Sequence, residues 1–216
     1  IYEEKDIGFY VGVSATQSQR YITIDIHDHE TSEIHILDAT DPKSLPRLIA
    51  PRSKGHQYSL EHNGDRLIIT TNSQGAEDFR IVETPIDTPG MDNWREIVPH
   101  RAGRLIIDVN VYARHMTRLE REDGLPRIVI TRLEDGQEHS IAFDEEAYAL
   151  GMAAGYEYDT TSLRFTYSSM TTPAETYDYD METRARTFRK RQDVPSGHNP
   201  QNYVTRRLFA TAQDGE

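Results

Sequence analysis

One strand-like segment recurs four times along this chain, as Glu33–Asp38 (EIHILD), Phe79–Thr84 (FRIVET), Arg127–Arg132 (RIVITR) and Glu175–Asp180 (ETYDYD). The four segments begin 46, 48 and 48 residues apart. A fixed period of this order is typical of repeat architectures, and about four short strands in roughly 45 residues make up one blade of a β-propeller. The spacing therefore predicts an all-β chain of four repeated units, each an antiparallel, four-stranded blade.

The residues around these segments fit short strands joined by tight turns. Isoleucine occupies every second position of Tyr21–Ile26, at Ile22, Ile24 and Ile26, which is the pattern of a half-buried strand. Asn63-Gly64-Asp65 and Asp135-Gly136 are hairpin signals, because glycine accepts the positive φ that such turns require. Asp144–Leu150 is the one candidate for a helical turn, and it is too short to be a stable helix alone. The predicted blades cover residues 9–51, 57–99, 104–143 and 150–190.

The two ends of the sequence indicate how the chain is organised. We expect a partial propeller over residues 1–194, a linker over 195–202 and one further strand over 203–216. Pro195–Pro200 contains proline, serine, glycine and asparagine, which favour irregular backbone. Tyr203–Ala210 alternates like a strand and is followed by a single turn, and residue 1 is isoleucine. We therefore expect the chain to be a piece of a longer protein.

Composition restricts the class of protein. The 216 residues are 36% hydrophobic and include 12 Tyr and 6 Phe, which is enough apolar and aromatic material for a core. The mean hydropathy of −0.71 indicates a very polar surface. No apolar run approaches the length of a membrane span, so we expect no membrane association. Cysteine is absent, which excludes disulfides and thiolate metal sites and fits a reducing compartment. We expect a cytoplasmic location.

The formal charge of −12 constrains the partners. Phosphate backbones are repelled by such a surface, so nucleic acid is not an expected partner. A negative field concentrates cations, so basic peptides are favoured, although charge alone also serves solubility.

A catalytic serine is not indicated by the sequence. A nucleophilic serine needs a Gly-x-Ser-x-Gly elbow or an equivalent turn beside an oxyanion hole, and the chain contains no such elbow. Ser196-Gly197-His198 has both residue types, but it lies in the predicted linker, and we interpret it as linker. No phosphate loop or EF-hand loop is present either.

Two groups of polar residues are candidates for metal binding or for acid–base catalysis. His27-Asp28-His29-Glu30 places two imidazoles at i and i+2, which share a face of a strand and suit zinc. The tetrapeptide falls where a hairpin must turn, however, and we interpret it as turn residues. Adjacent carboxylates recur at Glu3-Glu4, Glu122-Asp123 and Glu145-Glu146. Glycoside chemistry needs two carboxylates that face each other, so we interpret these pairs as solvated.

A basic cluster and a group of tyrosines occur near the last predicted blade. Arg184–Arg191 (RARTFRKR) contrasts with the acidic chain, and we interpret it as a solvated or interdomain edge strand on which Arg184, Arg186 and Lys190 share a face. An acidic partner domain or nucleic acid is the alternative interpretation of this cluster. The tyrosines are interpreted as core packing between blades, with ligand stacking as the alternative; they are Tyr156, Tyr158, Tyr167, Tyr177 and Tyr179.

Several stretches resemble the prolyl oligopeptidase family. Tyr167–Pro173 (YSSMTTP), followed by an aspartate-rich strand, resembles that family's last propeller blade. Ile1–Asp6 (IYEEKD) followed by Phe9-Tyr10, together with His56–Leu60 (HQYSL), looks like the oligopeptidase B branch. Tyr203–Glu216 (YVTRRLFATAQDGE) is similar to the strand with which that family's chain leaves its propeller. The resemblance covers essentially the whole chain in order.

The resemblance implies a two-domain serine peptidase, with a seven-bladed propeller over an α/β-hydrolase domain that holds a Ser-His-Asp triad. Enzymes like oligopeptidase B cut short peptides after Lys or Arg, and the propeller covers the active site and limits substrate size. This chain resembles roughly blades four to seven plus the first strand of the hydrolase domain. None of the triad positions falls inside it, so the resemblance implies no catalytic, cofactor-binding or metal-binding residue here and an inactive fragment. The implied partners are the C-terminal α/β-hydrolase domain of the same protein and short basic peptides.

Two alternatives remain from the sequence: a non-catalytic propeller that binds a peptide or protein, and a propeller hydrolase with carboxylates at its central channel.

A partial propeller also leaves one face of its first and last blades without a neighbouring blade. We therefore expect self-association through apolar residues on these faces; the candidates are Tyr21, Ile22, Ile24, Leu163, Phe165 and Tyr177.

Overall fold

The chain forms four antiparallel sheets of four strands each, in the computed structural model, which describes residues 2–41, 43–153, 155, 157–211 and 213. Each sheet uses four strands that are consecutive in the sequence. This arrangement confirms the predicted all-β, four-blade fold.

The strand bounds are as follows. The first sheet contains β1 (Tyr10–Ala15), β2 (Tyr21–His27), β3 (Ser32–Asp38) and β4 (Arg47–Leu48). The second contains β5 (Tyr58–Asn63), β6 (Arg66–Thr71), β7 (Arg80–Pro85) and β8 (Arg95–Val98). The third contains β9 (Arg104–Val111), β10 (His115–Glu122), β11 (Leu125–Arg132) and β12 (Glu138–Ser140). The fourth contains β13 (Ala149–Ala153), β14 (Ser162–Ser168), β15 (Glu175–Asp180) and β16 (Arg186–Arg191). Within the described residues, three short 3₁₀ turns lie in the loops, as η1 (Ser73–Gly75), η2 (Met91–Asn93) and η3 (Pro200–Asn202).

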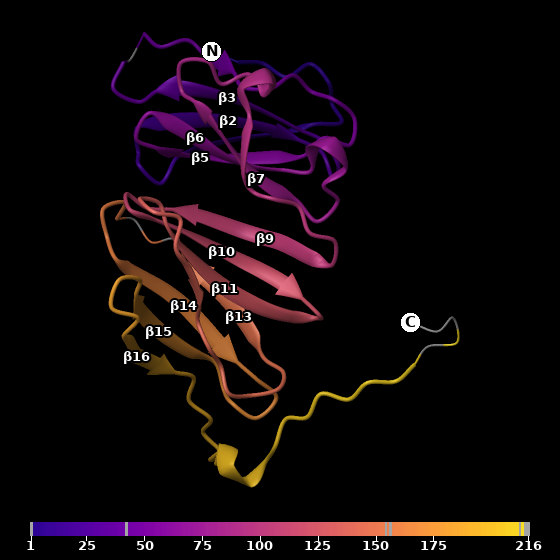
Figure 1. The fold of residues 1–216 in the computed structure, drawn as a ribbon, viewed down its shortest axis with the longest axis vertical. Helices are drawn as coiled ribbons and strands as arrows, with labels where there is room; N and C mark the ends of the chain where they lie inside the picture. Colours follow the sequence, from indigo (N-terminus) through magenta and orange to yellow (C-terminus); the bar gives the residue numbers. More distant parts are fainter. Residues whose placement is uncertain (1, 42, 154, 156, 212, 214–216) are drawn as a thin grey trace.

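The sheets stack face to face in chain order, from the indigo first sheet to the orange and yellow fourth sheet (Figure 1). Strand β3 contacts β5, β5 contacts β9, and β11 contacts β13, so every junction joins consecutive sheets. Each junction buries its own apolar cluster: Ile34, Ile36, Leu67 and Ile69 at the first, Ile68, Ile81, Ile106 and Met116 at the second, and Leu119, Ile128, Leu163 and Phe165 at the third.

Side-chain alternation on the strands explains this packing. Along β14, Leu163, Phe165 and Tyr167 are buried against the third sheet. The residues between them, such as Arg164 and Thr166, are exposed on the opposite face. Successive residues of a strand point to opposite faces, so one apolar row per strand is sufficient to bind the neighbouring sheet.

The face of the third sheet that packs against the second also buries charge. Arg118 and Glu120 are 1% exposed and lie on the face of β10 that carries Met116. Arg118 Nε donates to Glu120 Oε1 over 2.9 Å, and its Nη1 donates to Glu138 Oε1 over 2.6 Å. A buried charge is tolerated only when it is paired and hydrogen-bonded, and this pairing satisfies that condition.

Some local predictions are corrected by the structure. The hairpin at residues 63–65 forms, but Asn63 pairs with Arg66, so Gly64 (φ 64°) and Asp65 are its central residues. Asp144–Leu150 forms bends and the start of β13, with no helix. Residues 203–211 are irregular, so the final strand expected over 203–216 stays a prediction. Ile1 and residues 214–216 lie outside the described residues.

The loop between β13 and β14 reaches across the stack to the first two sheets. Gln17, in the β1–β2 hairpin, donates from Nε2 to the carbonyl oxygens of Gly155 (3.4 Å) and Glu157 (3.3 Å). Asn63 Nδ2, in the β5–β6 hairpin, donates to the Tyr158 hydroxyl over 2.9 Å. These contacts join sheets that are not neighbours in the stack.

The outer face of the first sheet is apolar over β1 and β2 and partly covered, and Glu33 and His35 of β3 lie on the same face. Ile24, Ile26 and Leu37 pack under Tyr2 and Phe9 of the N-terminal segment. The same face continues with three exposed side chains, which are Val11 (48%), Val13 (71%) and Ile22 (37%). Of the candidates for this surface, Ile22 is exposed there, whereas Ile24 is only 6% exposed and Tyr21 packs against the second sheet.

The outer face of the fourth sheet is polar, contrary to the expectation. Leu163 and Phe165 are 0% exposed because they face the third sheet, and Tyr177 packs against the same cluster. Arg164 instead makes a two-bond ion pair with Asp178, at 2.7 and 3.0 Å. Arg189 Nε donates to the same carboxylate over 2.6 Å.

No helix among the described residues is long and apolar enough to cross a membrane.

Candidate functional site

Two adjoining cavities form a groove between the first three sheets. The first, of about 350 Å³, is lined by residues of β2, β3, β5, β6 and β9. The second, of about 260 Å³, is lined by residues of β5, β6 and β9. Ser59, Thr70 and Ile107 line both cavities, which makes the groove continuous. A concave surface with apolar walls and a few polar groups is the usual form of a ligand site.

Carboxylates line both parts of this groove. Asp25 and Asp28 lie in the first cavity, and Glu61 and Asp108 lie in the second. The hydroxyl of Thr23 donates to Asp25 Oδ2 over 2.7 Å, which fixes that side chain. The groove therefore presents a negative lining to whatever enters it, and such a lining attracts cationic groups.

Glu61 differs from the other carboxylates in its protonation. The pKa of Glu61 is raised to about 7, chiefly by burial and also by the charges of Asp108 and Asp25, against the hydrogen bond from the Gln17 amide. That amide donates to Glu61 Oε2 over 2.7 Å. A carboxyl with this pKa is about half ionised near neutral pH, and an incoming cation would favour its ionised form.

The second cavity also holds a hydrogen-bond donor. Asn110 lines it, and its buried Nδ2 has no hydrogen-bond partner among the described residues. An amide donor of this kind suits a carbonyl oxygen, while the carboxylates suit amines or guanidinium groups. The groove is therefore equipped for binding an extended, basic chain.

The His27–Glu30 tetrapeptide forms a turn, as interpreted from the sequence. Asp28 Oδ1 accepts the backbone amides of Glu30 (2.8 Å) and Thr31 (2.6 Å). His27 and Asp28 line the first cavity, while His29 is exposed. Within the described part of the chain, no group of three or more His, Cys, Asp or Glu residues is arranged to hold a metal ion.

The candidate serine and histidine of the linker lie away from the groove. His198 Nε2 donates to the carbonyl oxygen of Thr171 over 2.7 Å, and its ring stacks on Tyr203. Neither Ser196 nor His198 lines the two cavities.

The adjacent carboxylate pairs bind separate cations or hydroxyls. Glu4 accepts from Arg52 Nη2 over 2.5 Å, while Glu3 is exposed. Glu122 pairs with Arg127 at 2.7 Å and with Arg101. Glu145 and Glu146 contact the segment that follows β16. Glu146 is exposed, as interpreted, whereas Glu145 is half-buried, so the interpretation as solvated is wrong for Glu145.

The basic cluster forms the edge strand β16, whose six residues are all exposed, as interpreted. A register shift next to Tyr177 places Phe188 opposite Tyr177 and Lys190 opposite Thr176. This bulge puts Arg186 and Lys190 on opposite faces, so the prediction that they share a face is wrong.

The tyrosines divide between two environments. Tyr167 and Tyr179 are buried in the cluster between the third and fourth sheets, and Tyr177 packs against it, which confirms the interpretation as core for these three. Tyr158 instead bonds Asn63. Tyr156 lies outside the described residues.

Sequence reasoning missed the groove carboxylates Glu61 and Asp108. They lie on β5 and β9, strands of different sheets, so their proximity follows from sheet stacking and no local pattern shows it.

Comparison with known proteins places the chain in a family. Residues 1–192 match the sequence profile of the prolyl oligopeptidase N-terminal β-propeller domain. The chain therefore belongs to the prolyl oligopeptidase family of peptidases, and its four sheets are part of that family's propeller.

Particular relatives point to one branch. The chain is 34% identical to dipeptidyl aminopeptidase BI of Pseudoxanthomonas mexicana and 28% identical to protease 2 of Moraxella lacunata, matching over its whole length. It spans about 30% of the length of these relatives. The structure of Trypanosoma brucei oligopeptidase B with covalently bound antipain, in its closed form, matches with a TM-score of 0.91 at 34% identity. Leishmania major oligopeptidase B matches with a TM-score of 0.92 at 25% identity. Both structural matches cover the whole chain and 32% of the other protein. The resemblance to oligopeptidase B is thereby confirmed.

Proposed function

We propose that this chain is the substrate-gating part of an oligopeptidase B-like serine peptidase that cuts short peptides after Lys or Arg. On this proposal the chain itself hydrolyses nothing, and it acts together with a C-terminal α/β-hydrolase domain of the same protein. The observation that carries the proposal is the match of the whole chain to oligopeptidase B structures at TM-scores of 0.91 and 0.92.

The groove supports the preference for basic peptides. Asp25, Asp28 and Asp108 line a continuous groove with Glu61, and Asn110 adds an amide donor. Carboxylates at a concave surface raise the local concentration of cationic peptides and favour their entry. The groove thus selects by charge before any contact with a catalytic residue.

The test uses the intact protein that contains this chain, beside the 216-residue chain alone. Peptide amides ending in Arg, in Lys or in citrulline, the neutral analogue of Arg, are the substrates. We expect the intact protein to prefer Arg over citrulline by at least about a hundredfold in kcat/KM, because a site built to pair a guanidinium group leaves its own polar groups unpaired when a neutral analogue binds. A serine-directed inhibitor abolishes this activity, and the 216-residue chain shows none.

Gating is tested by substrate length in the same protein. We expect cleavage of Arg-containing peptides of about ten residues and none of the same sequence within a folded domain, because a propeller that covers the active site admits only narrow chains. Equal cleavage of both substrates would contradict gating. Binding of basic peptides without any hydrolysis by the intact protein would favour the alternative, a non-catalytic binding propeller.

We further propose a cytoplasmic location, supported by the absence of cysteine from all 216 residues. Cell fractionation with an antibody against this chain tests it, and recovery in an extracytoplasmic fraction would contradict it.

A further inference from the structure

Glu145 lies in the turn between β12 and β13 and accepts hydrogen bonds from four hydroxyl groups. Its Oε1 accepts from Tyr167 and from Thr172, both at 2.7 Å. Its Oε2 accepts from Thr171 at 2.9 Å and from Thr205 at 3.0 Å. A carboxylate with both oxygens bonded twice is held in one position, because every movement breaks a charge-assisted bond.

The four hydroxyls come from two separate parts of the chain. Tyr167, Thr171 and Thr172 belong to β14 and the turn after it, within the fourth sheet. Thr205 lies beyond β16, 60 residues from Glu145. Glu145 therefore joins the body of the last sheet to the segment that leaves it.

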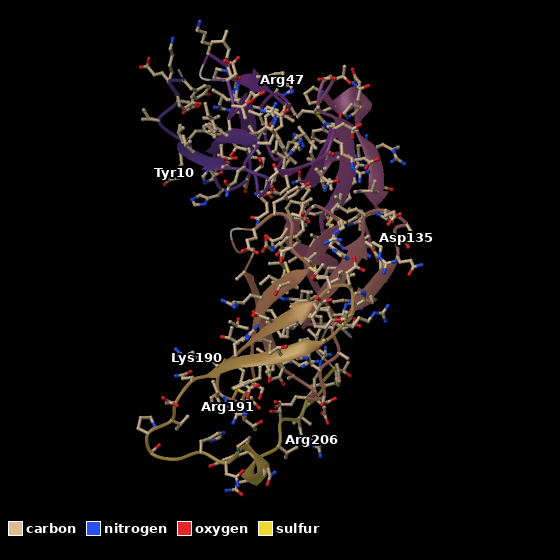
Figure 2. The ribbon with its side chains drawn as sticks, turned by 90° about the vertical axis from the view of Figure 1, so that its left-hand side faces the viewer. Tyr10, Arg47, Asp135, Lys190, Arg191 and Arg206 are labelled. Atoms are coloured by element: carbon tan, nitrogen blue, oxygen red, sulfur yellow. The ribbon has the colours of Figure 1, made fainter. Side chains whose placement is uncertain are left out.

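Glu146 binds the next two residues of the same segment. Arg206 Nη1 donates to Glu146 Oε1 over 2.6 Å, and the Arg207 backbone amide donates to Oε2 over 3.0 Å. Two neighbouring carboxylates thus contact three consecutive residues, Thr205 to Arg207. Figure 2 shows Arg206 beyond the end of the last sheet, below Lys190 and Arg191.

The upstream end of the segment is tied to the same turn. His198 Nε2 donates to the Thr171 carbonyl oxygen over 2.7 Å, and its ring stacks on Tyr203 with centroids 5.5 Å apart. Between these ties lies only the short 3₁₀ turn η3. The segment from residue 198 to residue 207 is therefore fixed at both of its ends, although most of its side chains are exposed.

The charge state of Glu145 suits this role. Burial raises the pKa of Glu145, but hydrogen bonds from the surrounding hydroxyls outweigh burial and lower that pKa to about 2. Glu145 is therefore ionised at every pH at which the fold is normally studied, and its hydroxyl bonds are of the stronger, charge-assisted kind.

We propose that Glu145 and Glu146 form a latch that holds residues 203–207 against the fourth sheet, so that the chain beyond pivots after Arg207 and not at Arg191, where β16 ends. Hinges are a few residues that absorb large changes of φ and ψ, and a bound segment cannot absorb them. If the proposed function holds, the latch also sets the position of the following catalytic domain; that part of the inference rests on the proposed function, and the latch itself does not.

The first experiment measures amide hydrogen exchange over residues 198–210 in the intact protein. Thr205→Val removes one hydroxyl from the tail and leaves the fourth sheet unaltered, and Thr205→Ser is its matched control. We expect exchange of the Arg207 amide to rise at least about tenfold in Thr205→Val, since one lost hydrogen bond of about 1.4 kcal/mol has this effect. Thr205→Ser should exchange like the wild type.

The second experiment tests the carboxylate. Glu145→Gln keeps the shape and removes the charge, and Glu134→Gln, at an exposed turn residue, is the control. We expect faster trypsin cleavage after Arg206 and Arg207 in Glu145→Gln only, with unchanged exchange in β14 and β15, which shows that the sheet is intact. Rapid wild-type exchange at Arg207, or equal behaviour of Thr205→Val and Thr205→Ser, overturns the latch.

The third measurement separates the latch from the proposed function. Small-angle scattering of the intact protein should show a wider range of domain separations in Thr205→Val than in Thr205→Ser. If amide exchange rises in Thr205→Val but the scattering does not change, the proposed pivot after Arg207 is wrong. The proposed function is tested separately, by peptidase activity, and does not depend on that result.

Discussion

The first and fourth sheets are the same repeat unit, yet their outer faces are opposite in character. In the first sheet the outward side chains of β1 and β2 are mostly apolar, with Val13 71% exposed and Ile24 covered by the N-terminal segment. In the fourth sheet the outward row carries Arg164, Asp178 and Arg189, joined as one ion-pair group. The hydrogen-bonded strand order is the same in both sheets.

This difference shows that the repeat specifies the side chains of each strand that face the neighbouring sheet. The side chains on the outward face of a terminal sheet are free to vary. The inner row must bury apolar area against the next sheet, about 25 cal/mol for each Å². The outer row of a terminal sheet has no such neighbour in this chain, so its composition decides between solvent exposure and association. Charged side chains at such a surface also discourage unwanted sheet contacts.

The sharpest test of this comparison substitutes neighbours on one strand. Phe165→Ala removes an inward, 0% exposed ring, and we expect the free energy of unfolding to fall by about 3–5 kcal/mol because a cavity remains. Arg164→Ala, on the outward face, should lower it by less than about 1 kcal/mol. Urea unfolding followed by far-UV circular dichroism measures both, and equal losses would contradict the assignment of faces.

The second test concerns association through the outer face of the first sheet. We expect the 216-residue chain to self-associate there and not through the fourth sheet. Val11→Lys combined with Val13→Lys should weaken association by at least roughly a hundredfold, since each valine contributes up to about 2 kcal/mol when buried. Thr166→Lys, on the outer face of the fourth sheet, is the control. Light scattering coupled to size exclusion measures the mass, and a monomer of 24.8 kDa at all concentrations would refute association.

The third test contrasts Asp178 with Glu61. The Arg164 guanidinium lowers the pKa of Asp178, whereas burial raises the pKa of Glu61 to about 7. A raised carboxyl pKa means that the folded state holds its proton more tightly, so this stability is present at low pH and is lost as pH rises from about 4.5 to about 7. Glu61→Gln should therefore gain stability relative to wild type between pH 5 and pH 8, on the order of 1–2 kcal/mol after screening. A flat difference over this range would contradict the raised pKa.

The smallest expected effect is at the ion-pair group itself. Asp178→Asn should lower the free energy of unfolding by less than about 1 kcal/mol in low salt, and less still at 1 M salt, because partly exposed pairs are screened. Asp135→Asn, in an exposed hairpin pair with Arg132, is the matched control. A loss above about 2 kcal/mol would show that the outer face of the fourth sheet is a structural element in its own right.

The repeat could be predicted from the sequence. Which face of each terminal sheet points toward the neighbouring sheet could not. Alternation in β14 shows that Leu163 and Phe165 share a face, but not that this face points to the third sheet. The apolar face of β14 could point toward the third sheet or away from it. The strand pattern is the same in both cases, so it does not show on which side the neighbouring sheet lies. The bulge in β16 was missed for a related reason, because alternation assumes an unbroken register.

The candidate site was less accessible from the sequence than the fold. Glu61 and Asp108 lie in one groove because two sheets stack, and Glu145 meets Thr205 across 60 residues. Neither proximity follows from local spacing. The turn at Asp28, in contrast, was predictable, because an aspartate side chain bonds the amides two and three residues ahead of it.

The reach of the β13–β14 loop has a consequence for how this chain loses its structure. In an array whose units contact only their immediate neighbours, end units can melt singly, and the transition broadens. Here Gln17 of the first sheet bonds Gly155 and Glu157, which precede β14 of the fourth. Melting either terminal sheet therefore breaks contacts at the far end of the stack as well as at its own junction. The contacts couple the four sheets energetically, so denaturation should follow a single, steep transition in which the first and last sheets unfold together.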